Sequence, residues 1–354
     1  MRILHTSDIH LDSALTARLP AARVRERKAE LFASFKALSA EALKLGCQAM
    51  IIAGDLFDCE RISRRAAERT LSVIESYPEL DYLYLPGNHE RYALLQMGLE
   101  LPENLKIFSE DWSYFDYGEV RIGGASELRE GICRGFDASG ALNIGVLHGT
   151  LADRGTEDFI GADDLSASGI DYLALGHYHS YGVYKPCESK EAVYCGVPEG
   201  RGFDEAGTKG YVLIEADRGR IKHSFHPFAR RTLHILRADV STVERRSELA
   251  RICDGVLGAI PSCDLVSLKL VGERAPSFNV DIDMLTAEYK ERFYYFEVKD
   301  ESRLRICKED YELDKSLKGE FIRLALARDG LPEEDREEII KLGLSALLGE
   351  IGEV

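Results

Sequence analysis

The sequence predicts an α/β (α+β) protein, in which central mixed β-sheets are flanked by helices. Three observations support this fold class. Short apolar runs rich in β-branched residues alternate with helical patterns through residues 1–230. A second strand–helix–strand pattern then begins, and the chain ends in two helical segments joined by a turn. We therefore predict a main domain over 1–230, a smaller α/β domain over 231–300 and a C-terminal helical hairpin over 301–354.

The strands predicted in the main domain are apolar runs bounded by turn residues. They are Arg2–Thr6, Ala49–Ala53, Tyr82–Leu85, Val120–Ile122, Asn143–Leu147, Tyr172–Leu175 and Tyr211–Glu215. The clearest helix runs from about Arg23 to Leu45, because apolar residues recur there at helical spacing and Gly46 then ends the pattern. A second helix is predicted over about Ser63–Ser76.

The smaller domain restarts the pattern just after Phe228-Ala229-Arg230-Arg231. Its predicted elements are a strand Thr232–Leu236, a helix Val243–Ala259, a strand Asp264–Leu270 and a strand Phe293–Val298. The hairpin is predicted as helices over Tyr311–Ala327 and from Glu333 to about Leu348. Pro332 suits the first turn of the second helix, where the missing N–H costs little.

Composition and charge restrict the function classes. With 45% hydrophobic residues and 10 prolines, the chain is typical of a globular protein. The eight cysteines form no C-x-x-C pair and suggest reduced thiols. The apolar run at the N-terminus is shorter than a signal peptide core, and no stretch approaches a membrane span, so we expect a cytoplasmic protein without membrane contact. The net charge of −16 argues against a general nucleic-acid coat protein.

Five short polar motifs follow predicted strands, at the strand ends where ligands gather in open α/β sheets. They are Asp8-Ile9-His10, Gly54-Asp55-Leu56-Phe57-Asp58, Gly87-Asn88-His89-Glu90, His148-Gly149 and Gly176-His177-Tyr178-His179. Each motif alone is compatible with a helix cap, a tight turn or a core histidine. Together they supply carboxylate, amide and imidazole ligands without any thiolate.

Such a donor set suits Mn²⁺, Fe or Zn²⁺ better than a soft metal, with Mg²⁺ as a further alternative. Two ions ~3.5–4 Å apart can activate water and stabilise both oxygens of a displacement at phosphorus. One carboxylate must then bridge the ions. Asp55 lies between the other groups in sequence and is our candidate for this bridge.

In this order, the five motifs resemble those of the calcineurin-like metallophosphoesterases, over about residues 1–215. The resemblance implies the metallophosphoesterase fold with two bound metal ions. It implies that Asp8, His10, Asp55 and His179 bind one metal, and that Asp55, Asn88, His148 and His177 bind the other. It also implies that His89 is no ligand but contacts the phosphate and assists the leaving group. Glu90 stands where an Asp is more usual and is expected to have a supporting role.

Three segments resemble the DNA-repair exonuclease branch of this family, which includes SbcD and the YhaO proteins. They are Gly54–Asp58, Asp171–His177 and Tyr194–Glu205, and the tail from Leu317 to Ile340 looks most like YhaO. The resemblance implies a capping domain over 231–300, a DNA substrate and a large coiled-coil SMC-like ATPase as partner. A homodimer through the catalytic domain would also be expected.

Arginines beside two of the motifs could contact DNA. The candidates are Arg23, Arg27, Arg61, Arg64 and Arg65, although an ordinary solvated helix face explains such a charge run equally well. Residues 331–354 carry seven acids and two bases, so DNA is not expected there. The apolar residues of this tail suit packing onto the cap, or onto helices of a partner.

The sequence therefore favours a Mn²⁺-dependent DNA nuclease with a metal-activated water as nucleophile, acting in DNA repair. A phosphodiesterase or phosphatase for a small or protein substrate is the first alternative. A non-catalytic scaffold for an SMC-like ATPase is the second, and the complete set of ligand positions argues against it. The pattern does not distinguish exonuclease from endonuclease activity.

Overall fold

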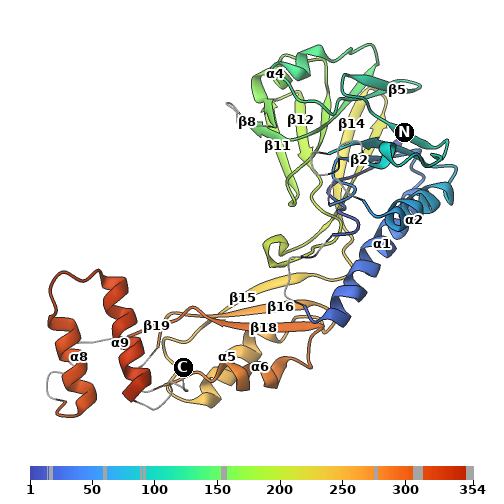
Figure 1. Cartoon of the computed structure of the whole chain (residues 1–354). Helices are drawn as coiled ribbons and strands as arrows, with labels where there is room; N and C mark the ends of the chain where they lie inside the picture. Colours follow the sequence, from blue (N-terminus) through green and yellow to red (C-terminus); the bar gives the residue numbers. More distant parts are fainter. Residues whose placement is uncertain are drawn as a thin grey trace. The chain divides into compact units, whose positions relative to one another are not determined.

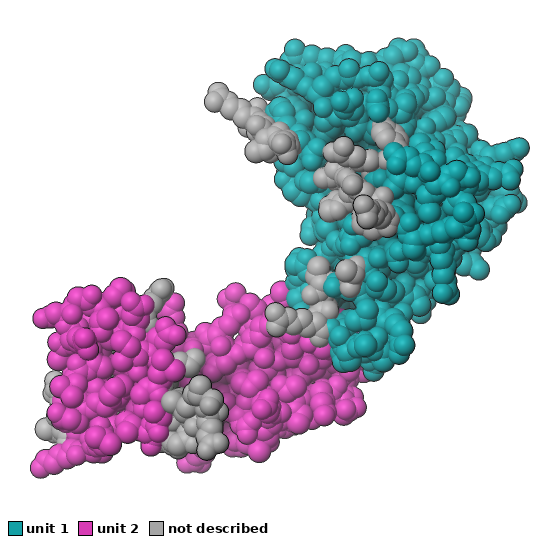
Figure 2. Space-filling view, viewed as in Figure 1, with its two compact units in different colours: residues 1–233 teal, residues 234–354 magenta. Residues whose placement is uncertain are grey.

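A computed structural model describes residues 1–354 except 14, 16–18, 59–61, 88–89, 91–92, 153–157, 275–277, 306–313 and 348–354. The chain forms two compact units, residues 1–233 and residues 234–354 (Figure 2). The sequence places this division after residue 230, within the same connecting segment. Within the described residues, no helix is long and apolar enough to cross a membrane.

Unit 1 is built around two mixed β-sheets (Figure 1). The first has the strand order β14-β13-β1-β2-β3-β4. Its strands are β1 (Arg2–Thr6), β2 (Ala49–Ala53), β3 (Asp81–Leu85), β4 (Leu105–Ile107), β13 (Gly210–Asp217) and β14 (Arg220–Pro227). Strands β1 to β4 are parallel, whereas β13 runs antiparallel to both β1 and β14. The carboxyl ends of β1, β2 and β3 therefore lie at one edge of this sheet.

The second sheet has the order β11-β12-β10-β7-β6-β5. Its strands are β5 (Ser113–Tyr117), β6 (Val120–Gly124), β7 (Leu142–His148), β10 (Tyr172–Gly176), β11 (Gly182–Cys187) and β12 (Lys190–Tyr194). The central strands β6, β7, β10 and β12 are parallel, and β5 and β11 are antiparallel edge strands. Two short strands, β8 (Thr150–Ala152) and β9 (Phe159–Gly161), pair separately.

The two sheets pack face to face over a core of alternate strand residues such as Ile51, Leu83, Val146 and Ala174. The opposite face of the first sheet is covered by α1 (Ala21–Lys44) and α2 (Arg64–Glu75). The remaining helical segments of unit 1 are α3 (Ala93–Gln96), η1 (Ile132–Gly135), α4 (Ala162–Ser166) and η2 (Phe203–Glu205). Central strands of the two sheets, such as β2 and β10, are buried on both faces. They are therefore almost continuously apolar, as the sequence indicated.

Unit 2 contains a smaller sheet with the order β15-β16-β18. Its strands are β15 (Leu233–Asp239), β16 (Leu265–Val271) and β18 (Tyr295–Asp300), and α5 (Arg246–Leu257) and α6 (Ile282–Tyr289) share one apolar core with them. A short pair, β17 (Glu273–Arg274) with β19 (Arg303–Leu304), follows.

The hairpin of α8 (Leu317–Ala327) and α9 (Glu333–Leu347) has a separate small core, centred on Ile322 and Ile340. These elements confirm the predicted fold class. The further division of this unit at residue 300 stays a prediction.

Candidate metal centre

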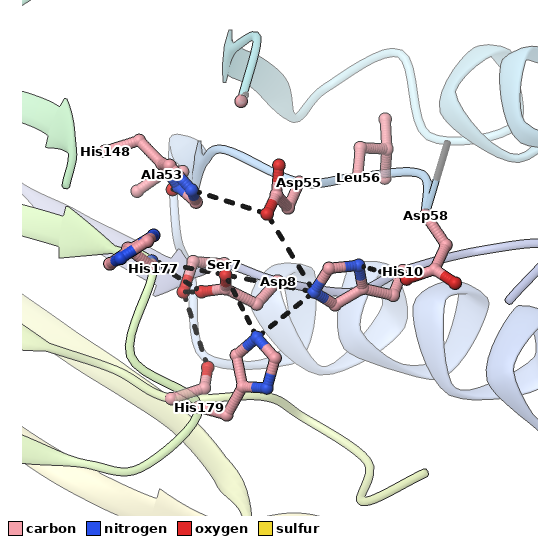
Figure 3. A network of polar contacts seen from close by, with 12 residues as sticks. Ser7, Asp8, His10, Ala53, Asp55, Leu56, Asp58, His148, His177 and His179 are labelled. Atoms are coloured by element: carbon pink, nitrogen blue, oxygen red, sulfur yellow. Dashed lines mark hydrogen bonds and ion pairs between the residues drawn. The ribbon is translucent and has the colours of Figure 1, made fainter. Parts of the chain in front are cut away.

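The candidate site lies where strands of both sheets end (Figure 3). Asp8 follows β1 and Asp55 follows β2 in the first sheet, and His148 ends β7 in the second. Two backbone hydrogen bonds join the loops after β1 and β2: the Asp8 amide donates to the Gly54 carbonyl over 3.1 Å, and the His10 amide donates to the Asp55 carbonyl over 3.0 Å. Parallel pairing in each sheet thus brings together motifs that are far apart in the chain.

A first cluster of possible ligands contains Asp8, His10 and His179, each with one ligand atom within 4.8 Å of the others. Nε2 of His10 lies 3.3 Å from Nε2 of His179, and the latter lies 3.7 Å from Oδ1 of Asp8. Asp8 and His10 are almost fully buried. A carboxylate and two imidazoles converging at this spacing can hold one divalent ion.

A second cluster contains Asp8, Asp55 and His148, again within 4.8 Å. Oδ2 of Asp55 lies 3.4 Å from Nε2 of His148 and 4.0 Å from Nε2 of His10. Nδ1 of His148 lies 2.9 Å from the Ala53 carbonyl, and donation of its proton there leaves Nε2 available as a ligand. Asp55 is thus positioned between a histidine of each cluster.

The other predicted site residues are placed differently. His177 lies beside the second cluster, with its ring centroid 5.4 Å from that of His148. The backbone amide of His177 donates to Asp8, over 3.2 Å to Oδ1 and 3.1 Å to Oδ2, and so helps to hold this carboxylate. The predicted ligand Asn88 and the predicted catalytic residue His89 lie outside the described residues.

The backbone at this site is unusual. Four of the predicted ligands have positive φ angles: Asp8 and His10 at 50°, Asp55 at 49° and His177 at 101°. Such conformations cost on the order of 1–3 kcal/mol for a non-glycine residue and cluster at functional sites. The fold therefore holds these side chains in place at the expense of local backbone energy.

The motif glycines Gly54 and Gly176 have no room for a side chain. A Cβ atom on Gly54, where φ is +91°, would lie 2.0 Å from Nδ1 of His148. A Cβ atom on Gly176 would lie 1.8 Å from the Ala53 carbonyl oxygen. The glycines of the G-D and G-H motifs thus allow the two sheets to approach closely around His148.

A network that the sequence did not reveal supports the first cluster. Nδ1 of His10 lies 2.9 Å from Oδ1 of Asp58, and Nδ1 of His179 lies 2.8 Å from Oε1 of Glu205. The guanidinium of Arg201 contacts both carboxylates, at 2.6 Å from Asp58 and 2.6 Å from Glu205. A carboxylate behind a ligating histidine fixes its ring and orients Nε2 toward the metal.

Two sequence signals pointed to this network. Asp58 is the last residue of the second polar motif, and Asp58, Arg201 and Glu205 fall within two segments that resembled the exonuclease branch, Gly54–Asp58 and Tyr194–Glu205. Lys209, which donates from Nζ to the His179 carbonyl over 2.7 Å, had no such signal.

Negative charge dominates the centre. Burial lowers the pKa of His148, but the hydrogen bond to Asp55 and the charges of Asp8 and Asp55 outweigh it and raise this pKa to about 9. Burial also lowers the pKa of His179, but Glu205 and Asp8 raise it overall. Burial and the positive charge of His148 lower the pKa of His177. The carboxylates thus stabilise positive charge between the clusters.

Glu90 lies behind the loop that follows β2. It is buried, and its carboxylate accepts hydrogen bonds from the amides of Leu56 over 2.9 Å and Phe57 over 2.5 Å. Burial, together with the charge of Asp55, raises the pKa of Glu90 to about 8. Glu90 thereby stabilises the backbone of the loop that carries Asp55.

The arginines predicted as DNA contacts fall into three groups. Arg27 corrects the prediction: it is 1% exposed, and its guanidinium binds Glu30, Glu199 and the Gly200 carbonyl, so it is not available to DNA. Helical spacing did not show that this side of α1 faces other parts of the fold. Arg23, Arg64 and Arg65 are exposed, the first two beside Glu26 and Glu68. Arg61 lies outside the described residues.

Comparison with known proteins places this geometry in a family. The family model described as calcineurin-like phosphoesterase matches residues 1–181, about half of the chain. The uncharacterized metallophosphoesterase YhaO of Bacillus subtilis is 31% identical over 246 residues, covering 64% of this chain and 60% of that protein. The DNA double-strand break repair protein Mre11 of Methanopyrus kandleri is 26% identical over 260 residues, covering 62% and 55%.

The matches thus span less than two thirds of either relative. Among solved structures, TT1561 of Thermus thermophilus aligns with a TM-score of 0.43 at 11% identity, covering 63% of this chain and 98% of that one. The match of the family model agrees with the order of the motifs and the paired ligand clusters. The chain therefore belongs to the calcineurin-like phosphoesterase family, whose members are metal-dependent phosphoesterases.

Proposed function

We propose that this phosphoesterase is a Mn²⁺-dependent nuclease that hydrolyses DNA phosphodiester bonds during DNA repair. The observation that carries the proposal is the pair of ligand clusters that share Asp8, with Asp55 positioned between His10 and His148. The likeness to a protein named as a DNA double-strand break repair protein supports DNA as the substrate.

The residues present fit two divalent ions. Asp8 and Asp55 are buried carboxylates whose ligand atoms lie within 4.8 Å of each other and of His148. Buried like charges are costly unless a cation compensates them. Oxygen and imidazole nitrogen donors without a thiolate suit Mn²⁺, with Fe, Zn²⁺ and Mg²⁺ as alternatives.

The proposed roles rest on the two ligand clusters and, for His177, Asn88 and His89, on the family resemblance. Asp8, His10 and His179 would hold one ion, Asp55 would bridge, and His148 with His177 and Asn88 would hold the other. When bound, the ions would activate a water molecule and stabilise charge on the phosphate oxygens. His89 would contact the phosphate and assist the leaving group, by charge stabilisation or proton donation, as the family resemblance implies. Asp58, Glu205 and Arg201 would keep the rings of His10 and His179 oriented.

The test is a digestion panel with purified protein and Mn²⁺. The substrates are single- and double-stranded DNA labelled at the 5′ or 3′ end, a simple aromatic diester, a cyclic nucleotide and a phosphoprotein. We expect DNA cleavage that is abolished by chelation, and the position of the label in the products identifies exonuclease or endonuclease action. Intact DNA together with hydrolysis of the cyclic nucleotide or the phosphoprotein would overturn the nuclease assignment in favour of a phosphodiesterase or phosphatase.

Two variants test the roles in this panel. His89→Gln should reduce turnover strongly while elemental analysis still finds two metals, whereas Asp55→Ala should lose metal. An unchanged rate in His89→Gln would remove His89 from the mechanism. Wild-type protein that binds two metals and hydrolyses none of the substrates would favour a non-catalytic scaffold.

Partners are proposed on the family resemblance. We infer that the chain acts on DNA together with a large coiled-coil SMC-like ATPase, and that it can form a homodimer. Light scattering of the purified chain, alone and mixed with such an ATPase from the same genome, would measure both associations. Monomeric protein that does not bind the ATPase would contradict them.

A further inference from the structure

A cluster of three tyrosines adjoins the candidate metal centre. Tyr178 lies between His177 and His179 in the chain, Tyr184 lies on β11 and Tyr194 ends β12. The ring of Tyr194 lies 4.7 Å from that of Tyr178 and 5.6 Å from that of Tyr184, measured between centroids. We call these three residues the tyrosine platform.

The central ring of the platform is fixed. Tyr194 is buried, its hydroxyl donates to the Gly149 carbonyl over 2.8 Å, and it accepts from the Leu151 amide over 2.8 Å. Both partners follow His148, which belongs to the second ligand cluster. Tyr194 thus ties the platform to the same loop as the metal centre.

The two outer rings are accessible. Tyr178 is 40% exposed and Tyr184 is 46% exposed, although both contact the buried ring of Tyr194. The ring of Tyr178 also lies 5.6 Å from the ring of His177. An exposed tyrosine alone needs no explanation. Tyr178 and Tyr184 share one anchored ring, and Tyr178 also contacts the ring of His177. They form a preorganised aromatic surface beside the candidate metal centre.

The chemistry of this surface favours a flat aromatic ligand. Lys185, the neighbour of Tyr184, is paired with Glu191 over 2.6 Å, so its charge is already compensated. The chain carries a net charge of −16, which weakens attraction for a phosphate backbone. Stacking on a tyrosine does not depend on charge and accepts every nucleobase, because each base has a π-face.

We propose that the tyrosine platform binds a nucleobase next to the scissile phosphate, by stacking on Tyr178 with Tyr184 extending the surface. This inference rests on the proposed nuclease function and specifies its substrate as DNA with an unpaired base at the cleavage site. The platform places the nucleotide through its base, while the metal centre acts on its phosphate. Stacking of this kind is tolerant of sequence, so no strong base preference is expected.

The experiment compares two single-stranded substrates of equal length and charge. One is an end-labelled oligothymidylate, and the other carries tetrahydrofuran abasic residues in place of all nucleosides. For the wild-type enzyme with Mn²⁺, kcat/KM should be roughly 5- to 150-fold higher on the substrate with bases, the range of one stacked base. Tyr178→Ala and Tyr184→Ala should bring this ratio toward one, and Tyr178→Phe should keep it.

Tyr181→Ala provides a matched control. Tyr181 is 39% exposed and belongs to the same segment, but its ring stacks on Phe225 of β14, with centroids 4.6 Å apart. Its removal should leave the ratio unchanged. Metal content is measured for every variant, because Tyr178 lies between two predicted ligands. If Tyr178→Ala loses metal, the ratio measured for Tyr184→Ala on β11 tests the platform instead.

The outcomes separate the two proposals. If the wild type cleaves both substrates but no platform variant changes their ratio, the stacking role is overturned and the nuclease function stands. If the wild type cleaves neither substrate nor any other DNA, the nuclease function itself fails. A lower ratio in both alanine variants and a kept ratio in Tyr181→Ala would support the platform.

Discussion

Nη2 of Arg201 lies 2.6 Å from Oε1 of Glu205, and the same oxygen lies 2.8 Å from Nδ1 of His179. Burial raises the pKa of Glu205, but the bonds from His179 and Arg201 outweigh it and lower this pKa to about 2. Glu205 therefore stays ionised and holds the ring of His179. Since Arg201 also binds Asp58, it couples the carboxylates behind both histidines of the first cluster.

Neutralising Glu205 should weaken metal binding. In Glu205→Gln the ring of His179 loses its anionic partner, and we expect the affinity for one metal ion to fall by about 10- to 100-fold. Isothermal calorimetry, in which metal-free protein is titrated with Mn²⁺, measures this affinity. Glu68→Gln removes an exposed partner of Arg64 on α2 and is the control. Equal affinities in the two variants would show that Glu205 does not orient a ligand.

Adding a methyl group at Gly54 should displace His148. The Cβ atom would lie 2.0 Å from Nδ1 of this histidine, so Gly54→Ala should reduce both the bound metal and the rate of hydrolysis. Gly207→Ala separates steric contact from backbone strain, because Gly207 has φ +95° but no heavy atom within 4 Å of the place its Cβ would occupy. Strain alone costs on the order of 1 kcal/mol. Comparable losses of metal in both variants would contradict the steric explanation.

His5 should make stability depend on pH. Burial is the main cause that lowers the pKa of His5 from 6.5 to about 3. A hydrogen bond with Leu175 opposes this effect, and the charge of His223 adds to it. The unfolded chain therefore binds a proton below pH 6.5 that the folded chain does not, and stability falls as the pH falls. Between pH 6.5 and 5 this should cost about 2 kcal/mol.

Urea unfolding with EDTA at pH 7 and pH 5 measures this effect. The free energy of unfolding should decrease less in His5→Gln than in wild type, and groups that titrate in both proteins cancel in this comparison. The same decrease in both proteins would show that His5 is not the source of the pH dependence.

Removing Arg27 should destabilise unit 1. Arg27 contacts Glu30 and lies 3.4 Å from Glu199, and both carboxylates are buried. Loss of a partner from a buried pair leaves uncompensated charge, so Arg27→Ala should lower the free energy of unfolding by about 3–5 kcal/mol. Arg231, which also binds Glu30, would offset part of this loss.

The exposed pair of Arg23 with Glu26 is the matched control for this prediction. Arg23→Ala should cost less than ~1 kcal/mol in the same urea titration. Equal stabilities of the two variants would argue against a structural role for Arg27.

The strands and helices that bury a regular apolar face could be predicted from the sequence. The prediction for β1 has the bounds Arg2–Thr6 seen in the structure, and α1 and α2 begin and end within two residues of their predicted limits. All four edge strands of the two large sheets, β4, β5, β11 and β14, were missed, as was the inner strand β12. Half of β11 is exposed and it contains Pro186, and β14 largely alternates exposed and half-buried residues. Pairing partners rather than their own composition therefore define these strands.

The sequence by itself determined the donor types of the metal centre, their order and their position at strand ends, because these follow from local residue identity and strand periodicity. Only the tertiary structure decided that Arg201 joins the supports of His10 and His179, that Arg27 is buried, and that Tyr178 and Tyr184 share the ring of Tyr194. Arg201 and Asp58 are separated by 143 positions in the chain. Contacts at such separations depend on how two sheets pack against each other, and no local pattern records that packing.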